Sequence, residues 1–536
     1  LQADWPQALE EIKTGFAAGL LYPLYTTAHH THALFLDDEE LTEELRLNQE
    51  FLHDLLEAPR PRHPGFFFTE CSVRAERLPA LQRAGIEYVI FPHLNPRKAR
   101  YTVSQPDYAY AYLPFRVGEG IVALPRHFQV SQEIWRPLTR IDPEKARYQG
   151  YLMGAYPVFD TEYRERRYLP CPITLEQGVE EYVGVLREAL EAAPDGGLIL
   201  YIQDLELMDF GDLALNVLRE AWRRTLAETP HTVRFVTPDD VLGGLEPRQL
   251  PSVNFEGICW APEIRPVLRY DGHYPPLEAG ELHGIDAVPE IFPDHPFIFW
   301  EPGRPMVDLF TWILQAFGFP TTPGVSARIL VEEGYQFLQF PPEKRLPLHL
   351  RLMKQADNWG WRPEEGRNKR PYLHGFLISD YLLLYLRLYP ERLPAPRTAF
   401  PPRPFALFRR LPEVLFDSRF GYLDFGLKRY RDEKGLELSE AFAELTHARG
   451  ARERATMHLD QAAQVIGQLK PFSSDLALWQ ELLVALREHC RYTFLSLDRL
   501  QRAWGKAPDV EFLVMAMYKY LYEIYPPRWP AILEEV

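Results

Sequence analysis

Over the first 245 residues, short apolar runs alternate with amphipathic stretches, and this alternation limits the possible folds more than any other feature of the chain. Apolar runs bounded by turn residues predict strands, and apolar positions spaced three and four residues apart predict helices. Strands are expected at residues 20–27, 65–69, 88–91, 197–203 and 233–237, and helices at 39–56, 75–84, 175–193 and 213–228. Such alternation indicates parallel strands joined by helical crossovers, with the catalytic groups at the C-terminal ends of the strands.

The remainder of the chain divides by composition into three further parts. Residues 246–306 are dense in proline and glycine and lack helical periodicity, so we expect a connecting segment there. Helical patterns return in residues 307–404 and continue as long helices in 405–536. We therefore expect a catalytic α/β part in residues 1–245, followed by the connecting segment, a helical lid in 307–404 and a C-terminal helical region in 405–536.

Charge and composition exclude several classes of partner. The net charge of −16 argues against nucleic acid, since phosphate backbones bind basic surfaces. No apolar run approaches the roughly 18 to 20 residues that span a bilayer, so no membrane segment is expected. The first residues lack the layout of a signal peptide, and the cysteines lack CxxC spacing, which predicts a cytoplasmic protein with reduced thiols and without a zinc site or cofactor. The 49 prolines and abundant Arg and Glu are typical of a thermophilic protein.

Two of the expected strands end in carboxylates. Glu70 follows the run Gly65–Thr69, and Asp204 follows the run Gly197–Gln203, with Glu206 on the same face of an extended chain. Each carboxylate alone is compatible with a structural role, as a helix cap or as an ion-pair partner. Together, two carboxylates at one edge of a sheet are the groups that cleave glycosidic bonds, one as nucleophile and one as general acid and base.

The motifs around both carboxylates resemble those of family 57 of the glycoside hydrolases. Phe66–Cys71, followed by a helix and Ala84–Tyr88, is similar to the nucleophile region of that family. Tyr201–Gly211, with Asp204 and Glu206, is similar to its acid/base region. The resemblance implies that Glu70 is the nucleophile and Asp204 the general acid/base. It also implies a (β/α)7-type barrel, whose N-terminal strands we expect to be missing from this chain because the family's opening histidine motif is absent.

Three further stretches, at Thr26–Leu34, Arg126–Trp135 and 355–375, resemble other regions of the family that contact sugar. A metal-binding role for the histidines near residue 30 and core packing for the aromatic residues stay open as alternatives. The residues that the resemblance and the spacing assign to substrate binding are His30, Trp135, Glu206, Asp357, Trp359, Tyr372 and His374.

The sequence thus predicts a retaining enzyme that acts on α-1,4-glucan. A transferase (branching enzyme or 4-α-glucanotransferase) is favoured, because Ser131–Trp135 and the strand expected after Asp204 are most similar to branching enzymes. A hydrolytic α-amylase of the same family remains an alternative. A metal-dependent polysaccharide deacetylase and a catalytically silent glycan-binding protein are alternatives from other classes. The oligomeric state is not predicted.

Overall fold

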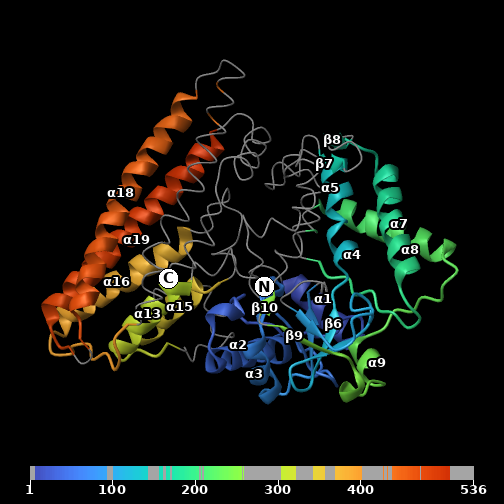
Figure 1. The fold of residues 1–536 in the computed structure, drawn as a ribbon, viewed down its shortest axis with the longest axis horizontal. Coiled ribbons are helices and arrows are strands. Elements are labelled where there is room, and N and C mark those ends of the chain that lie inside the picture. Colours follow the sequence, from blue (N-terminus) through green and yellow to red (C-terminus); the bar gives the residue numbers. More distant parts are fainter. Residues whose placement is uncertain are drawn as a thin grey trace.

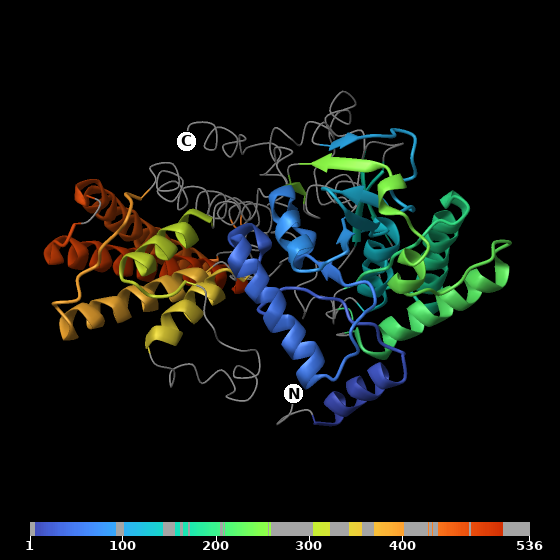
Figure 2. The ribbon, with the colours of Figure 1, turned by 90° about the horizontal axis from the view of Figure 1, so that it is seen from below.

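The computed structural model places a mixed sheet between two groups of helices (Figure 1). The bundle of α13, α15, α16, α18 and α19 lies on one side of the sheet, and α7 and α8 lie on the other, also in the view turned by 90° (Figure 2). The structure describes residues 6–92, 101–142, 156–160, 165–169, 172–203, 207, 210–255, 257–258, 304–321, 342–355, 369–400, 427, 431, 438–470 and 473–506.

The sheet has six strands in the order β1-β3-β6-β5-β9-β4. The first three are parallel, with Phe66 opposite Val89 and Val89 opposite Ala123. β5 runs antiparallel to β6 and parallel to β9, which pairs with β4 in antiparallel fashion. The strands are β1 (Gly65–Phe67), β3 (Tyr88–Phe91), β4 (Tyr101–Val103), β5 (Phe115–Val117), β6 (Ile121–Pro125) and β9 (Ser252–Phe255).

Two extended segments add to the parallel set without forming full strands. Tyr25 pairs with Phe66 of β1, and Leu200 pairs with Arg126 just beyond β6, both in parallel orientation. The strands expected at 20–27 and 197–203 therefore exist as single bridges. The strand expected at 233–237 is not observed, because these residues form no strand pairing among the described residues.

The predicted (β/α)7-type barrel is not confirmed, because the hydrogen-bonded sheet of the described residues is open. The physical reason is the hairpin of β5 and β6. β5 pairs with residues 121–123 of β6, on the side where the next parallel strand of a barrel would pair. The segment 198–202 consequently reaches this side only at Arg126, past the end of β6. The chain instead forms a mixed sheet accompanied by many helices.

Each face of the parallel set packs on its own apolar cluster. Side chains alternate between the two faces of a strand, so Val89 faces α2 (Asp38–Glu50) and α3 (Leu78–Arg83), while Tyr88 and Ile90 face the opposite cluster. Leu24 and Leu200, from segments at opposite ends of the parallel set, both pack against that second cluster. Leu242 of α9 (Pro238–Leu242) belongs to it as well. Segments from both ends of the parallel set thus pack on the same cluster.

The predicted helices of the first half are present as amphipathic elements. The capping box of Thr174 and Gln177 starts α7, and the buried residues of α7 and α8 form one cluster with those of α4 and α5. The predicted helix 39–56 is observed as α2 followed by a π-helical turn over Phe51–Leu55. The bounds are α4 (Phe128–Gln132), α5 (Trp135–Ile141), α7 (Leu175–Ala192) and α8 (Asp212–Glu228).

The second half of the described chain is helical, as predicted. Its helices share a single large core, in which Trp479 and Tyr372 are fully buried. Its members are α13 (Arg304–Ala316), α15 (Pro342–Met353), α16 (Arg370–Leu388), α18 (Ser439–Gln468) and α19 (Leu476–Gly505). No helix in the described part of the chain is both long and apolar enough to cross a membrane. The division of the chain at residues 245, 306 and 404 stays a prediction.

Candidate active site

Glu70 lies immediately after the parallel strand β1, in the 3-10 turn Thr69–Cys71. Its backbone is left-handed, with φ 58° and ψ 25°, and Cys71 has φ 48°. A side chain with a Cβ atom costs roughly 1–2 kcal/mol in this conformation. Thr69 and Cys71 are buried, whereas the Glu70 side chain is half-buried. Strained non-glycine residues concentrate at functional sites, so this geometry supports a functional role for the carboxylate at the end of β1.

The turn Thr26–His32, called the histidine turn below, lies directly against Thr69. The Thr27 hydroxyl donates to the Thr31 carbonyl at 3.0 Å and lies 2.9 Å from the Thr69 hydroxyl. Since the Thr27 proton is used, Thr69 donates to Thr27. His30 is exposed and is also left-handed, with φ 52°. The structure thus brings His30 and Glu70, both predicted site residues, onto two strained turns that are joined through a pair of threonines.

The two other histidines of this turn are buried and neutral. Burial, with the nearby Arg351 cation, lowers the pKa of His29 to about 4. Burial, with His30 and Arg74, lowers the pKa of His32 to about 3. An ionised carboxylate only accepts hydrogen bonds, so the neutral His29 ring donates from Nδ1 to Oε1 of Glu44 at 2.9 Å.

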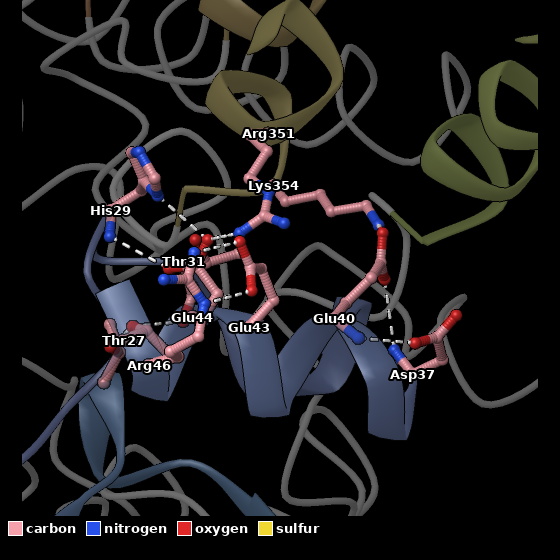
Figure 3. A network of polar contacts seen from close by, with 11 residues as sticks. Thr27, His29, Thr31, Asp37, Glu40, Glu43, Glu44, Arg46, Arg351 and Lys354 are labelled. Atoms are coloured by element: carbon pink, nitrogen blue, oxygen red, sulfur yellow. Dashed lines mark hydrogen bonds and ion pairs between the residues drawn. The ribbon is translucent and has the colours of Figure 1, made fainter. Parts of the chain in front are cut away.

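Glu44 belongs to a buried acidic face of α2 that meets a basic end of α15 (Figure 3). Its other oxygen accepts the backbone N–H of His29 at 3.0 Å, and Arg351 donates to the same carboxylate. Lys354 donates to Glu40 one turn earlier on α2. The four side chains are between 0% and 5% exposed, so both ion pairs are desolvated.

The end of α15 also contacts the backbone of the histidine turn. The N–H of His32 donates to the carbonyl of Lys354 at 3.1 Å, and Thr31 pairs with Gln355 in an antiparallel bridge. Residues more than 300 positions apart therefore form one polar assembly next to Glu70. Sequence reasoning missed Glu40, Glu44 and Arg351. The available signal was weak: two acidic residues four apart within an otherwise amphipathic helix.

The other predicted residues of the helical half are engaged in packing there. Tyr372 is fully buried and lies edge-on to His489, with ring centroids 6.0 Å apart. Nδ1 of His374 lies 2.9 Å from Nδ1 of His349, and burial lowers the pKa of His374 to about 3. Their predicted contact with substrate stays a prediction.

Trp135 begins α5 and is half-buried, edge-on to Phe210 at 6.2 Å within the core of α7 and α8. The predicted residues Asp204, Glu206, Asp357 and Trp359 lie outside the described residues. Just before Asp204, the N–H of Ile202 donates to the buried hydroxyl of Ser131 at 3.0 Å, which fixes the approach of this segment to α4.

Among the residues that the structure describes, no group of three or more His, Cys, Asp or Glu side chains is arranged to hold a metal ion. The histidine turn illustrates this, because His29 contacts the carboxylate Glu44 through Nδ1, and Glu44 is in turn occupied by Arg351. The arrangement at this edge of the sheet is therefore carboxylates, hydroxyls and neutral imidazoles, which suits hydrogen bonding to a neutral polyol.

Residues 2–139 match the model of glycosyl hydrolase family 57. The matched segment contains the histidine turn, Glu70 and Trp135, and it ends before Asp204. The match confirms the resemblance predicted from the motifs, and with it the prediction of an enzyme of this kind. No curated protein matches the chain.

Several solved structures are similar to this chain at low identity. The alpha-amylase AmyC from Thermotoga maritima is 16% identical over 76% of this chain and 74% of its own, with a TM-score of 0.40. A branching enzyme of the same family from Pyrococcus horikoshii is 15% identical over 72% and 70%, with a TM-score of 0.42. A 4-alpha-glucanotransferase from Thermococcus litoralis is 12% identical over 70% and 49%, with a TM-score of 0.36. At these values the similarity specifies no activity for this chain.

Proposed function

On the premise that residues 2–139 belong to glycosyl hydrolase family 57, we propose that this protein is a retaining enzyme that transfers segments of α-1,4-linked glucan. Glu70 attacks the anomeric carbon and forms a glycosyl-enzyme. Asp204 protonates the departing oxygen and later deprotonates the acceptor. The observation that carries the proposal is the strained, half-buried Glu70 at the C-terminal end of a parallel strand within the matched segment.

The topology supports a meeting of Glu70 with Asp204. Residues 24–25, β1, β3, β6 and 198–202 all run in the same direction, so their C-terminal ends lie at one edge of the sheet. On a flat sheet, the three steps from β1 to segment 198–202 would separate the two chain ends by roughly 14 Å, at about 4.8 Å a step. Retention needs about 5–5.5 Å between the carboxyl groups. A meeting of the two carboxyl groups therefore requires the parallel set, whose end segments both pack on one cluster through Leu24 and Leu200, to bring these chain ends closer than on a flat sheet.

Whether water is excluded from the glycosyl-enzyme determines which product forms. A transferase must keep water away until a sugar hydroxyl arrives, whereas an amylase admits it. The desolvated Glu44–Arg351 pair attaches α15 to α2 beside the histidine turn, which favours a covered site and hence transfer. Hydrolysis is the alternative outcome.

Incubation of the purified protein with amylose tests this proposal, with reducing ends and the iodine-stained chain profile followed in parallel. Transfer changes the chain profile with few new reducing ends, and hydrolysis raises reducing ends in step with the loss of staining. Wild-type protein that does neither, on amylose or on malto-oligosaccharides, would refute an α-glucan activity.

The roles of the two carboxylates are separable by azide. With an activated α-glucoside, Glu70→Ala plus azide is expected to give the β-glycosyl azide, because azide then attacks in place of the missing nucleophile. Asp204→Ala plus azide is expected to give the α-glycosyl azide, since azide then replaces the acceptor of an intact glycosyl-enzyme. If Glu70→Ala gave the α-glycosyl azide and Asp204→Ala the β-glycosyl azide, Asp204 would be the nucleophile and Glu70 the general acid/base.

A further inference from the structure

Glu44 makes contacts that connect the histidine turn to the helical half of the chain. Its carboxylate accepts both N–H groups of His29, from the backbone at 3.0 Å and from Nδ1 at 2.9 Å, and it is paired with Arg351. The Glu44 side chain is fully buried, and Arg351 is 1% exposed. Because the Glu44 carboxylate is shielded from water, its negative charge interacts with His29 and Arg351 rather than with solvent.

The contacts of Glu44 fix the chemical state of His29. Nδ1 carries the ring proton and donates a hydrogen bond to Glu44. The unprotonated nitrogen of the neutral ring is therefore Nε2, which is an acceptor. His29 Nε2 is buried and has no hydrogen-bond partner within the described ranges. Sugar hydroxyls are hydrogen-bond donors, so Nε2 has the chemical character that pairs with a glucan hydroxyl.

The bond from the backbone N–H of His29 to Glu44 also ties the turn to α2, and neighbouring contacts hold the rest of it. Asn48, one turn further along α2, accepts the N–H of Thr26 at 3.0 Å. The backbone carbonyl of residue 354, which a side-chain replacement leaves in place, accepts the N–H of His32, and Thr27 is hydrogen-bonded to Thr69, the residue before Glu70. Displacement of His29 would therefore also be felt at Glu70.

We propose that Glu44, held by Arg351, is a positioning residue for glucan turnover, which acts by fixing the orientation and tautomer of His29 and the placement of the histidine turn against Thr69. This inference rests on the proposed function. It assigns to α15 a part in assembling the site, since the cation that neutralises Glu44 comes from that helix. The second ion pair, Glu40 with Lys354, is equally buried but makes no contact with His29 among the bonds described, and it serves as a matched control.

The decisive variants are two double replacements that remove each ion pair without leaving a lone buried charge. Glu40→Gln/Lys354→Gln is expected to keep kcat and KM near wild type. Glu44→Gln/Arg351→Gln is expected to melt within a few degrees of that control, yet to lose at least tenfold in kcat/KM, mostly in kcat, because the amide keeps one acceptor oxygen where the carboxylate used two and cannot serve both N–H groups of His29. Equal activity of the two double variants would overturn the inference.

His29→Ala keeps the test decisive if the Glu44 variant does not fold. It leaves the Glu44–Arg351 pair in place and is expected to lose as much kcat/KM as Glu44→Gln/Arg351→Gln, with no further loss when the changes are combined. Full activity of His29→Ala, or losses that multiply, would refute the positioning role. Wild-type activity on amylose is measured first, so that failure of the proposed function is distinguished from failure of this inference.

Discussion

Glu70→Gly is expected to give a more stable protein than Glu70→Ala, and both replacements are expected to abolish activity. The left-handed backbone at φ 58° costs roughly 1–2 kcal/mol with a side chain present, and glycine adopts it without this cost. Glycine also gains freedom in the unfolded chain, which removes about 0.4–1 kcal/mol of that benefit. The Gly variant is therefore expected to exceed the Ala variant by about 0.5–1 kcal/mol, or about 1–2 °C for a cooperative unit of about 250 residues.

Glu57 provides the matched control. It is also left-handed, at φ 54°, but it is exposed and contacts only Lys13 among the ion pairs described. An exposed ion pair contributes about 0–1 kcal/mol, so Glu57→Gly is expected to be neutral or slightly stabilising and to keep full activity.

Differential scanning calorimetry and denaturant unfolding of wild type, Glu70→Gly, Glu70→Ala and Glu57→Gly measure the strain. The difference between the Gly and Ala variants at position 70 isolates the backbone cost, because both lack the carboxylate. Glu70→Gly should also lose at least about a thousandfold in turnover, since the proposed nucleophile is gone. Retained turnover, or a Gly variant less stable than the Ala variant, would refute the reasoning.

Three further predictions concern stability. Gly375→Ala should destabilise by about 1–3 kcal/mol, because the new Cβ would lie 2.8 Å from Sγ of Cys490, whereas Gly450→Ala, in open space on α18, should stabilise by about 0.4–1 kcal/mol; chemical denaturation measures both. Asp239→Ala should cost about 1–3 kcal/mol in thermal unfolding, since this carboxylate accepts from Tyr22 and from the backbone of His63. The free energy of unfolding should be constant above about pH 7 and fall from about pH 6.5 downward, by up to about 1.4 kcal/mol per pH unit for each buried histidine, because the unfolded chain takes up protons that the folded chain excludes until about pH 3–4. Urea midpoints between pH 7 and 5 test this for the histidines with lowered pKa, which are His29, His32, His349, His374 and His489.

The regular elements were the most predictable part of the fold. The apolar run at 88–91 coincides with β3, and the periodic stretches 175–193 and 213–228 coincide with α7 and α8 to within a residue. Closure of the sheet was not predictable, because it depends on whether β5 or a later segment pairs beside β6. That choice is made by tertiary pairing and leaves no periodic pattern in the sequence.

For the site, the motifs in the sequence predict Glu70 and His30, and the structure adds the strained backbone of both. Residue type gives little indication of a left-handed glutamate. Glu44 was missed for another reason: in an amphipathic helix a glutamate is expected to face water, and its partner Arg351 is 307 positions away. Contacts of that separation carry no signal in a single sequence.

The separation between Glu44 and Arg351 also bears on how the protein is made. During synthesis, the sheet and α2 emerge before α15 exists, so Glu40 and Glu44 have no cationic partner until residues 351 and 354 leave the ribosome. Unpaired carboxylates are costly to desolvate, and α2 in the nascent chain therefore keeps this face open to water. A chain interrupted before α15 would have its strands and Glu70 but would lack Arg351, which holds Glu44 and through it the histidine turn. Such a fragment is expected to lack the proposed activity on glucan.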